Sequence, residues 1–146
     1  MKIDLPGPTG RTQSYRLTGE PLPVRKPRTS FNRTAFAAAH VVAKPWSAKD
    51  PSGPPDIDWK ATIAYRRYLL DLGFGIAEAM DTSQRGMGLD WPNALDLIER
   101  SLKDAGSRAN RIYSGCGTDQ LKPDDARSLD DVVRAYLEQL HAIQKL

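Results

Sequence analysis

Apolar residues along the chain alternate between short continuous runs and stripes with helical spacing. The runs have the length of strands that are covered on both faces, and they occupy residues 36–43, 75–80 and 111–114. Helical spacing of apolar residues follows each run, over residues 58–72, 91–105 and 129–143. The alanine content of residues 36–43 leaves a helix open as an alternative there. Strand followed by helix, three times over, predicts an α/β fold with a parallel sheet and right-handed crossovers.

Capping residues mark the ends of the three expected helices. Asp58 and Asp90 are placed as N-caps of the first two, and Gly73 and Gly106 follow their last turns. Pro92 suits the first turn of the second helix, where its missing N–H costs nothing. Ser128 and Asp131 resemble a capping box, with aspartate in place of glutamate. The helix boundaries are therefore well specified.

Residues 1–30 differ in amino-acid composition from the rest of the chain. They are rich in proline and basic residues, so we expect an extended arm or short extended pieces there and the folded domain in residues 31–146. The net charge of +3 comes largely from this arm, and no aromatic residues are interleaved with it for base stacking. We interpret the arm as solvated and expect no nucleic-acid partner.

Size and composition exclude some of the remaining classes of protein. The 146 residues, 40% of them hydrophobic and 27% charged, suit one globular domain, and no apolar run approaches the ~20 residues that span a bilayer. We expect no membrane partner. The single cysteine, Cys116, excludes an internal disulfide framework, and the N-terminus has no secretory pattern, so a cytoplasmic location is expected.

The loops after the expected strands carry the candidate chemistry, because ligands bind at the carboxyl ends of parallel strands. The second loop offers a charge, hydroxyls and donors that suit a carboxylate or a carbonyl: Asp81, Thr82, Ser83 and Arg85. Asp81 and Thr82 have a second interpretation, as residues that merely cap or turn the chain. Glu78, within the apolar strand, needs a partner, which predicts either a site role or a structural ion pair at the pocket floor.

The third loop, residues 115–119, contains two glycines that permit close backbone approach, followed by Asp119. It lacks the lysine that ends a phosphate-binding loop. Cys116 is interpreted as an unreactive small residue, and His40, in the first strand, as either a core residue or a group behind the pocket. Metal-ligand spacing is missing, so we expect no metal and no cofactor.

Three stretches together resemble an uncharacterised bacterial family classed as dihydrodipicolinate-synthase-like. They are residues 31–42 (FNRTAFAAAHVV), 78–91 (EAMDTSQRGMGLDW) and 114–119 (SGCGTD), and the resemblance runs from about residue 30 to the end. It implies a (β/α)8 TIM barrel related to the class I aldolase-type lyases, which bind a 2-keto acid as a Schiff base on a lysine. This chain would then hold about the first three β/α units.

The resemblance also implies roles for two residues. In that superfamily a Gly-Thr-Thr-Gly-Glu motif after the second strand holds the carboxylate and relays protons, and residues 80–84 of this chain keep only the adjacent hydroxyls of Thr82 and Ser83. The strand that would carry the Schiff-base lysine belongs to a later unit, beyond three β/α repeats.

Two functions follow as expectations. The first is the N-terminal portion of an aldolase-like lyase for a keto acid or a sugar-derived carbonyl compound, inactive alone and prone to associate with itself or with a complementary chain. Its binding residues would be Glu78, Asp81, Thr82, Ser83, Arg85, Asp119 and His40. The alternative is a non-enzymatic α/β module that binds a small ligand or a partner protein. The two differ over whether the apolar stripe of residues 129–143 is covered within the chain.

Overall fold

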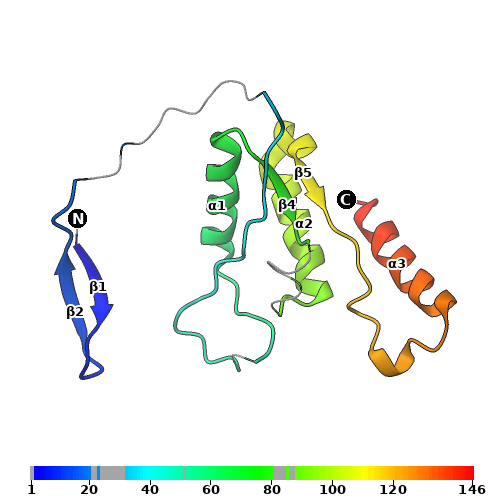
Figure 1. The fold of residues 1–146 in the computed structure, drawn as a ribbon, viewed down its shortest axis with the longest axis horizontal. Helices are drawn as coiled ribbons and strands as arrows, with labels where there is room; N and C mark the ends of the chain where they lie inside the picture. The colour runs from blue at the N-terminus through cyan, green and yellow to red at the C-terminus, as the bar shows by residue number, and fades with distance from the viewer. Residues whose placement is uncertain (1, 21–22, 24–31, 51, 81–84, 86–87) are drawn as a thin grey trace.

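The computed structural model describes residues 2–20, 23, 32–50, 52–80, 85 and 88–146. The chain has a mixed α/β structure with two small sheets and, among these residues, three α-helices (Figure 1). The helices are α1 (Trp59–Asp71), α2 (Trp91–Ala105) and α3 (Leu129–Ile143). One sheet pairs β1 (Lys2–Pro6) with β2 (Thr12–Arg16), and the other contains β3 (Phe36–Ala37), β4 (Gly75–Glu78) and β5 (Ile112–Ser114). Two 3-10 turns, Gly106–Arg111 and Pro123–Asp125, precede β5 and α3.

The three-stranded sheet is parallel, and its strand order β3-β4-β5 is the order of the sequence. An α-helix follows each strand, so the predicted alternation of strand and helix is confirmed. Ile76 in the middle strand pairs with Ala37 on one side and with Ile112 on the other. Because paired residues share a face, these three side chains lie on the same side of the sheet.

The two faces of this sheet have different surroundings. The face of Ile76 is packed against α1 and α2, in a cluster that includes Leu69, Leu70 and Ala105. On the opposite face Phe36 is 45% exposed and Tyr113 is 54% exposed. Parallel sheets are normally covered on both faces. Here the described residues cover one of them.

The predicted helix caps are confirmed. Asp58 Oδ1 accepts the Ala61 N–H at 2.9 Å, and Asp90 Oδ1 accepts the Asn93 N–H at 3.2 Å. Ser128 Oγ accepts the Asp131 N–H at 3.2 Å and donates to the Asp131 carboxylate at 2.7 Å. These bonds satisfy N–H groups that a helix start leaves without an intrahelical partner.

The first strand is much shorter than the expected residues 36–43. It ends at Ala37, and the chain then leaves the sheet because α1 binds its backbone. Arg66 donates to the carbonyls of Ala39 and His40, and Thr62 Oγ1 accepts the Val42 N–H at 2.9 Å. Side-chain partners from a helix thus replace the ladder that the apolar run predicts.

The N-terminal arm contains the short extended pieces that its composition predicts. They form an antiparallel hairpin in which Ile3 pairs with Tyr15 and Leu5 with Gln13, and Gly10 adopts a positive φ of 73° in the connecting turn. The pairing itself was not predicted. The prolines permit it because Pro6 occupies the end of β1.

Helix α3 turns most of its apolar stripe away from the rest of the chain. Its buried residues are Ala135 and Gln139, whereas the large apolar side chains of its first turns are exposed. The exposed set comprises Leu129, Val132, Val133, Tyr136 and Leu137. The described residues therefore leave the first turns of this stripe uncovered, whereas Ile143 at its end packs against a core cluster of α2. None of the described helices has the length and apolar content needed to cross a membrane.

A buried ion pair joins the helices to the sheet. Glu78, at the end of β4, is fully buried, and its carboxylate accepts from Arg66 Nε at 2.6 Å and from Arg66 Nη2 at 2.7 Å. Ser101 Oγ, from α2, donates to the same carboxylate at 2.6 Å. The pair therefore connects α1, β4 and α2 at one point.

Removing either partner of this pair should destabilise the fold strongly. We expect Glu78→Leu to lower the free energy of unfolding by about 3–5 kcal/mol, because it leaves the Arg66 guanidinium buried without a counter-charge. The combined change Arg66→Met with Glu78→Leu should cost less than the sum of the two single changes. Urea unfolding of the full chain measures both.

The matched control is Arg67→Met, which breaks the ion pair between Arg67 and Asp104 on the surface, where the arginine side chain is 55% exposed. It should cost no more than about 1 kcal/mol. Equal losses for Arg67→Met and Glu78→Leu would contradict the role given to the buried pair.

Candidate functional site

A pocket of about 480 Å³ lies at the carboxyl ends of β4 and β5. Its walls come from the end of β4, from Arg85 and from the segment that follows β5. The lining residues are Ala79, Met80, Arg85, Gly115, Cys116, Gly117, Thr118 and Asp119. This is the edge of a parallel sheet at which ligands bind in α/β proteins.

The strand end is shaped by two unusual backbone positions. Ala79 has a positive φ of 45°, which turns the chain out of β4 directly after Glu78. A Cβ on Gly115 would lie 3.0 Å from Met80 Cα, so a side chain there would displace the segment after β4. The close approach of the two strand ends accounts for the first glycine of the loop after β5.

Arg85 is the central charge of the pocket. Its Nε donates to Asp119 Oδ2 at 3.2 Å, its Nη1 donates to the Gly115 carbonyl at 3.1 Å, and its Nη2 is bonded to Asp119 Oδ1. The guanidinium also lies over the Trp91 ring, 5.3 Å from its centroid. The Arg85 side chain is only 6% exposed, so these contacts hold a nearly desolvated cation in place.

Among the residues that the structure describes, one donor of Arg85 is left for a ligand. A guanidinium has five N–H groups, and Nε, Nη2 and one N–H of Nη1 are taken by Asp119, Gln139 and Gly115. The second Nη1 N–H has no partner among the residues that the structure describes. Burial lowers the pKa of Arg85, while the negative charges of Cys116 and Tyr136, when these are ionised, raise that pKa. Arginine nevertheless stays charged at neutral pH.

Gln139 of α3 connects both sides of the pocket. It is fully buried, and its Oε1 accepts from Arg85 Nη2 and, at 2.8 Å, from the Gly117 N–H. Its Nε2 donates to Asp119 Oδ1 at 3.0 Å. A Cβ on Gly117 would lie 3.2 Å from that same carboxylate oxygen, so the second glycine of the loop makes room for the Arg85–Asp119 pair.

The structure brings two of the predicted site residues together, Arg85 and Asp119. Glu78 faces the helices instead and forms the structural ion pair, which was the second of its two predicted roles. His40 is exposed and does not line the pocket, and its carbonyl is the group that contacts Arg66. Asp81, Thr82 and Ser83 lie outside the described residues.

Gln139 is the site residue that sequence reasoning missed. It lies within a helix whose apolar stripe drew attention to other positions. A weak signal was present, because Ala135 and Gln139 are spaced by one helical turn and form a narrow face beside the stripe. Within the described part of the chain, no cluster of histidine, cysteine and acidic residues could hold a metal ion.

The comparisons with known proteins identify a family. Residues 3–146 match the family described as "Protein of unknown function (DUF993)", so the chain belongs to the DUF993 family. The search among curated proteins found no match.

Replacing Gln139 by leucine should loosen the pocket more than it weakens the fold. The change leaves the Gly117 N–H and one N–H of Arg85 without their acceptor, at a cost of about 1–3 kcal/mol in the free energy of unfolding. We also expect the Arg85 side-chain N–H signals in nitrogen-15 NMR spectra to broaden or shift. Gln144→Leu, at the exposed end of α3, is the control and should alter neither measurement. Unchanged Arg85 signals in the Gln139 variant would contradict the contact.

Proposed function

We propose that this DUF993-family protein is the N-terminal part of a (β/α)8 barrel that binds a small carbonyl compound at the carboxyl ends of its strands. The compound is a keto acid or a sugar-derived carbonyl compound, as in the dihydrodipicolinate-synthase-like lyases that the sequence resembles. One observation carries this proposal: a parallel sheet in sequence order is covered by helices on one face, left open on the other by the described residues, and bordered by a polar pocket at its carboxyl edge.

The barrel proposal is supported by the two faces of the sheet. In a closed barrel the helices form the outer layer and the other face of each strand lines the interior. Ile76 and Ile112 contact the helix layer here, whereas Phe36 and Tyr113 lie on the face that would be interior. Further β/α units beside β5 would complete the ring and cover that face.

The binding proposal is supported by the pairing of a donor and an acceptor in the pocket. The remaining N–H of Arg85 Nη1 suits a carbonyl oxygen, and a cation beside that oxygen polarises the carbonyl group. Asp119, whose side chain is 34% exposed, suits a hydroxyl group of the same ligand. Because Asp119 would repel a carboxylate, the acid group of a keto acid would lie away from it.

Covalent catalysis would require a residue from another β/α unit. The strands β3, β4 and β5 contain no lysine, so none of them supplies the amine of a Schiff base. We therefore propose that this chain binds the carbonyl compound and does not cleave it alone.

The alternative, a self-sufficient non-enzymatic module, predicts that the apolar stripe of α3 is covered within the chain. Leu129 is instead 77% exposed and Val133 is 45% exposed. This exposure favours the partial barrel, because a packed neighbour on that side would bury both residues.

Binding of pyruvate, as the simplest keto acid, tests the proposed site. Fluorescence of Trp91 should change on binding because its ring contacts Arg85. We expect Arg85→Gln to weaken binding about tenfold or more, since it removes a charged donor worth roughly 1.5–3 kcal/mol. The matched control is Arg100→Gln, because Arg100 lies over Trp59 in a similar way but outside the pocket.

Treatment of the pyruvate complex with borohydride should leave the protein mass unchanged. A reduced lysine adduct would contradict the assignment of the Schiff-base lysine to another unit. Pyruvate binding that is equally strong in the wild type and in Arg85→Gln would contradict the proposed site.

Self-association of the chain tests the exposed stripe. We expect sedimentation velocity to show concentration-dependent oligomers, and Leu129→Lys with Val133→Lys to shift the population toward monomer, because two charges would have to be buried. His141→Lys adds a charge at an exposed position of the same helix and should leave the oligomers unchanged. A wild-type chain that stays monomeric at all concentrations would favour the self-sufficient module.

A further inference from the structure

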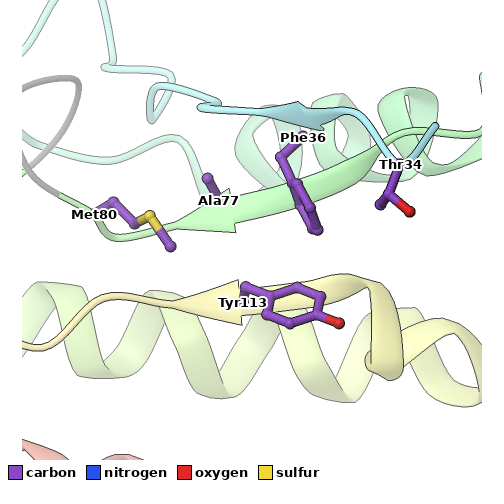
Figure 2. A pocket seen from close by; sticks show the side chains of 5 residues that line it. All are labelled: Thr34, Phe36, Ala77, Met80 and Tyr113. Carbon is purple, nitrogen blue, oxygen red and sulfur yellow. The ribbon is translucent and has the colours of Figure 1, made fainter.

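A second pocket lies on the open face of the sheet. It has a volume of about 480 Å³. Figure 2 shows its lining side chains on one side of β3, β4 and β5, with Met80 at one end and Thr34 at the other. The lining residues are Thr34, Phe36, Ala77, Met80 and Tyr113. None of them is charged, and the hydroxyls of Thr34 and Tyr113 are the only polar side-chain groups among them.

The two pockets are neighbours, because Met80 lines both. Met80 follows β4 at its carboxyl end, and Ala77 lies farther back along the same strand. A ligand held by Arg85 therefore has an apolar surface beside it that extends along β4 toward Phe36. The polar pocket alone already has the volume of a site for a larger ligand than a three-carbon acid.

We propose that the ligand of this site carries an apolar arm, aromatic or branched, attached to its carbonyl group. This inference rests on the proposed function and names its substrate class: an aryl or branched-alkyl keto acid rather than pyruvate. The carbonyl oxygen accepts from Arg85, and the arm passes Met80 and lies over Ala77 against the paired rings of Phe36 and Tyr113.

The shape of the second pocket suits an aromatic ring. Phe36 and Tyr113 form an edge-to-face pair with centroids 4.9 Å apart and planes at 81°. Both rings are about half exposed, so a ligand ring placed against them removes apolar surface of the protein and of the ligand from water. The small side chain of Ala77 leaves volume at the bottom of the pocket. Gly75 leaves space for the Phe36 ring, because a Cβ at residue 75 would lie 2.5 Å from that ring.

The absence of charge in the second pocket decides the orientation of the ligand. A carboxylate placed among Phe36, Ala77 and Tyr113 would lose its hydration without gaining a charged donor. The carbonyl end must therefore lie at Arg85, with the acid group turned away from Asp119, and only an apolar group fits the other end. Side chains from a neighbouring β/α unit are the competing occupant of this face.

The experiment compares phenylpyruvate with pyruvate on the full chain, with binding followed by calorimetry. We expect phenylpyruvate to bind about tenfold tighter or more. Ala77→Leu should fill the bottom of the second pocket and remove the tighter binding of phenylpyruvate, while pyruvate binding is unchanged. Tyr113→Ala, at a position exposed enough to tolerate truncation, should also reduce the advantage. Ala64→Leu, on the exposed surface of α1, is the control for the added side chain.

The outcomes separate this inference from the proposed function. If the two acids bind with equal affinity and both lose binding in Arg85→Gln, the carbonyl site is retained but the proposed apolar arm is contradicted. The open face would then be covered by side chains of another β/α unit. Phenylpyruvate binding that persists in Arg85→Gln would mean adsorption to the open face alone and would also overturn the inference. Binding of neither acid would overturn the proposed function itself.

Discussion

The ion pair between Arg66 and Glu78 is the interaction on which the described domain depends. Its donors and acceptors come from α1, from β4, from α2 through Ser101, and from the carbonyls of Ala39 and His40. Two buried charges are costly to desolvate, and such a pair stabilises a structure only when all of its hydrogen-bonding groups are satisfied. The arginine meets this condition, since each of its five N–H groups has an acceptor when the Thr62 carbonyl is included.

This ion pair also determines which face of β4 is available to a ligand. Because Glu78 and Ile76 both face the helices, the intervening Ala77 faces the open side. The carboxylate of Glu78, which stands out in the sequence because it lies within an apolar strand, thus attaches the sheet to its helices. The pocket charge comes instead from Arg85 and Asp119, which lie beyond the strand ends and contact each other across the two loops.

The sequence predicted local structure well and contacts between distant residues poorly. Helix ends follow from caps such as Asp58 and Ser128, whose hydrogen bonds reach only three residues along the chain, so the pattern alone contains the information. The prediction of a strand over residues 36–43 was wrong beyond Ala37, because the backbone there is bound by Arg66, more than twenty residues away in the sequence. Arg85 and Asp119 were predicted from their positions after strands, whereas Gln139 was missed, because its spacing from Ala135 is a weak signal and its contacts exist only once α3 is packed.

The position of α3 connects the pocket to the uncovered surface of the chain. One side of the helix inserts Gln139 between Arg85, Asp119 and the Gly117 backbone, and another side presents Leu129, Val133 and Tyr136 to solvent. A partner that covers the apolar side adds contacts to the helix without touching the ligand. Since Gln139 fixes the positions of Arg85 and Asp119, such contacts would stabilise the arrangement that we propose for binding a carbonyl compound. In a partial barrel, completion of the ring and organisation of the pocket would therefore be coupled through this one helix.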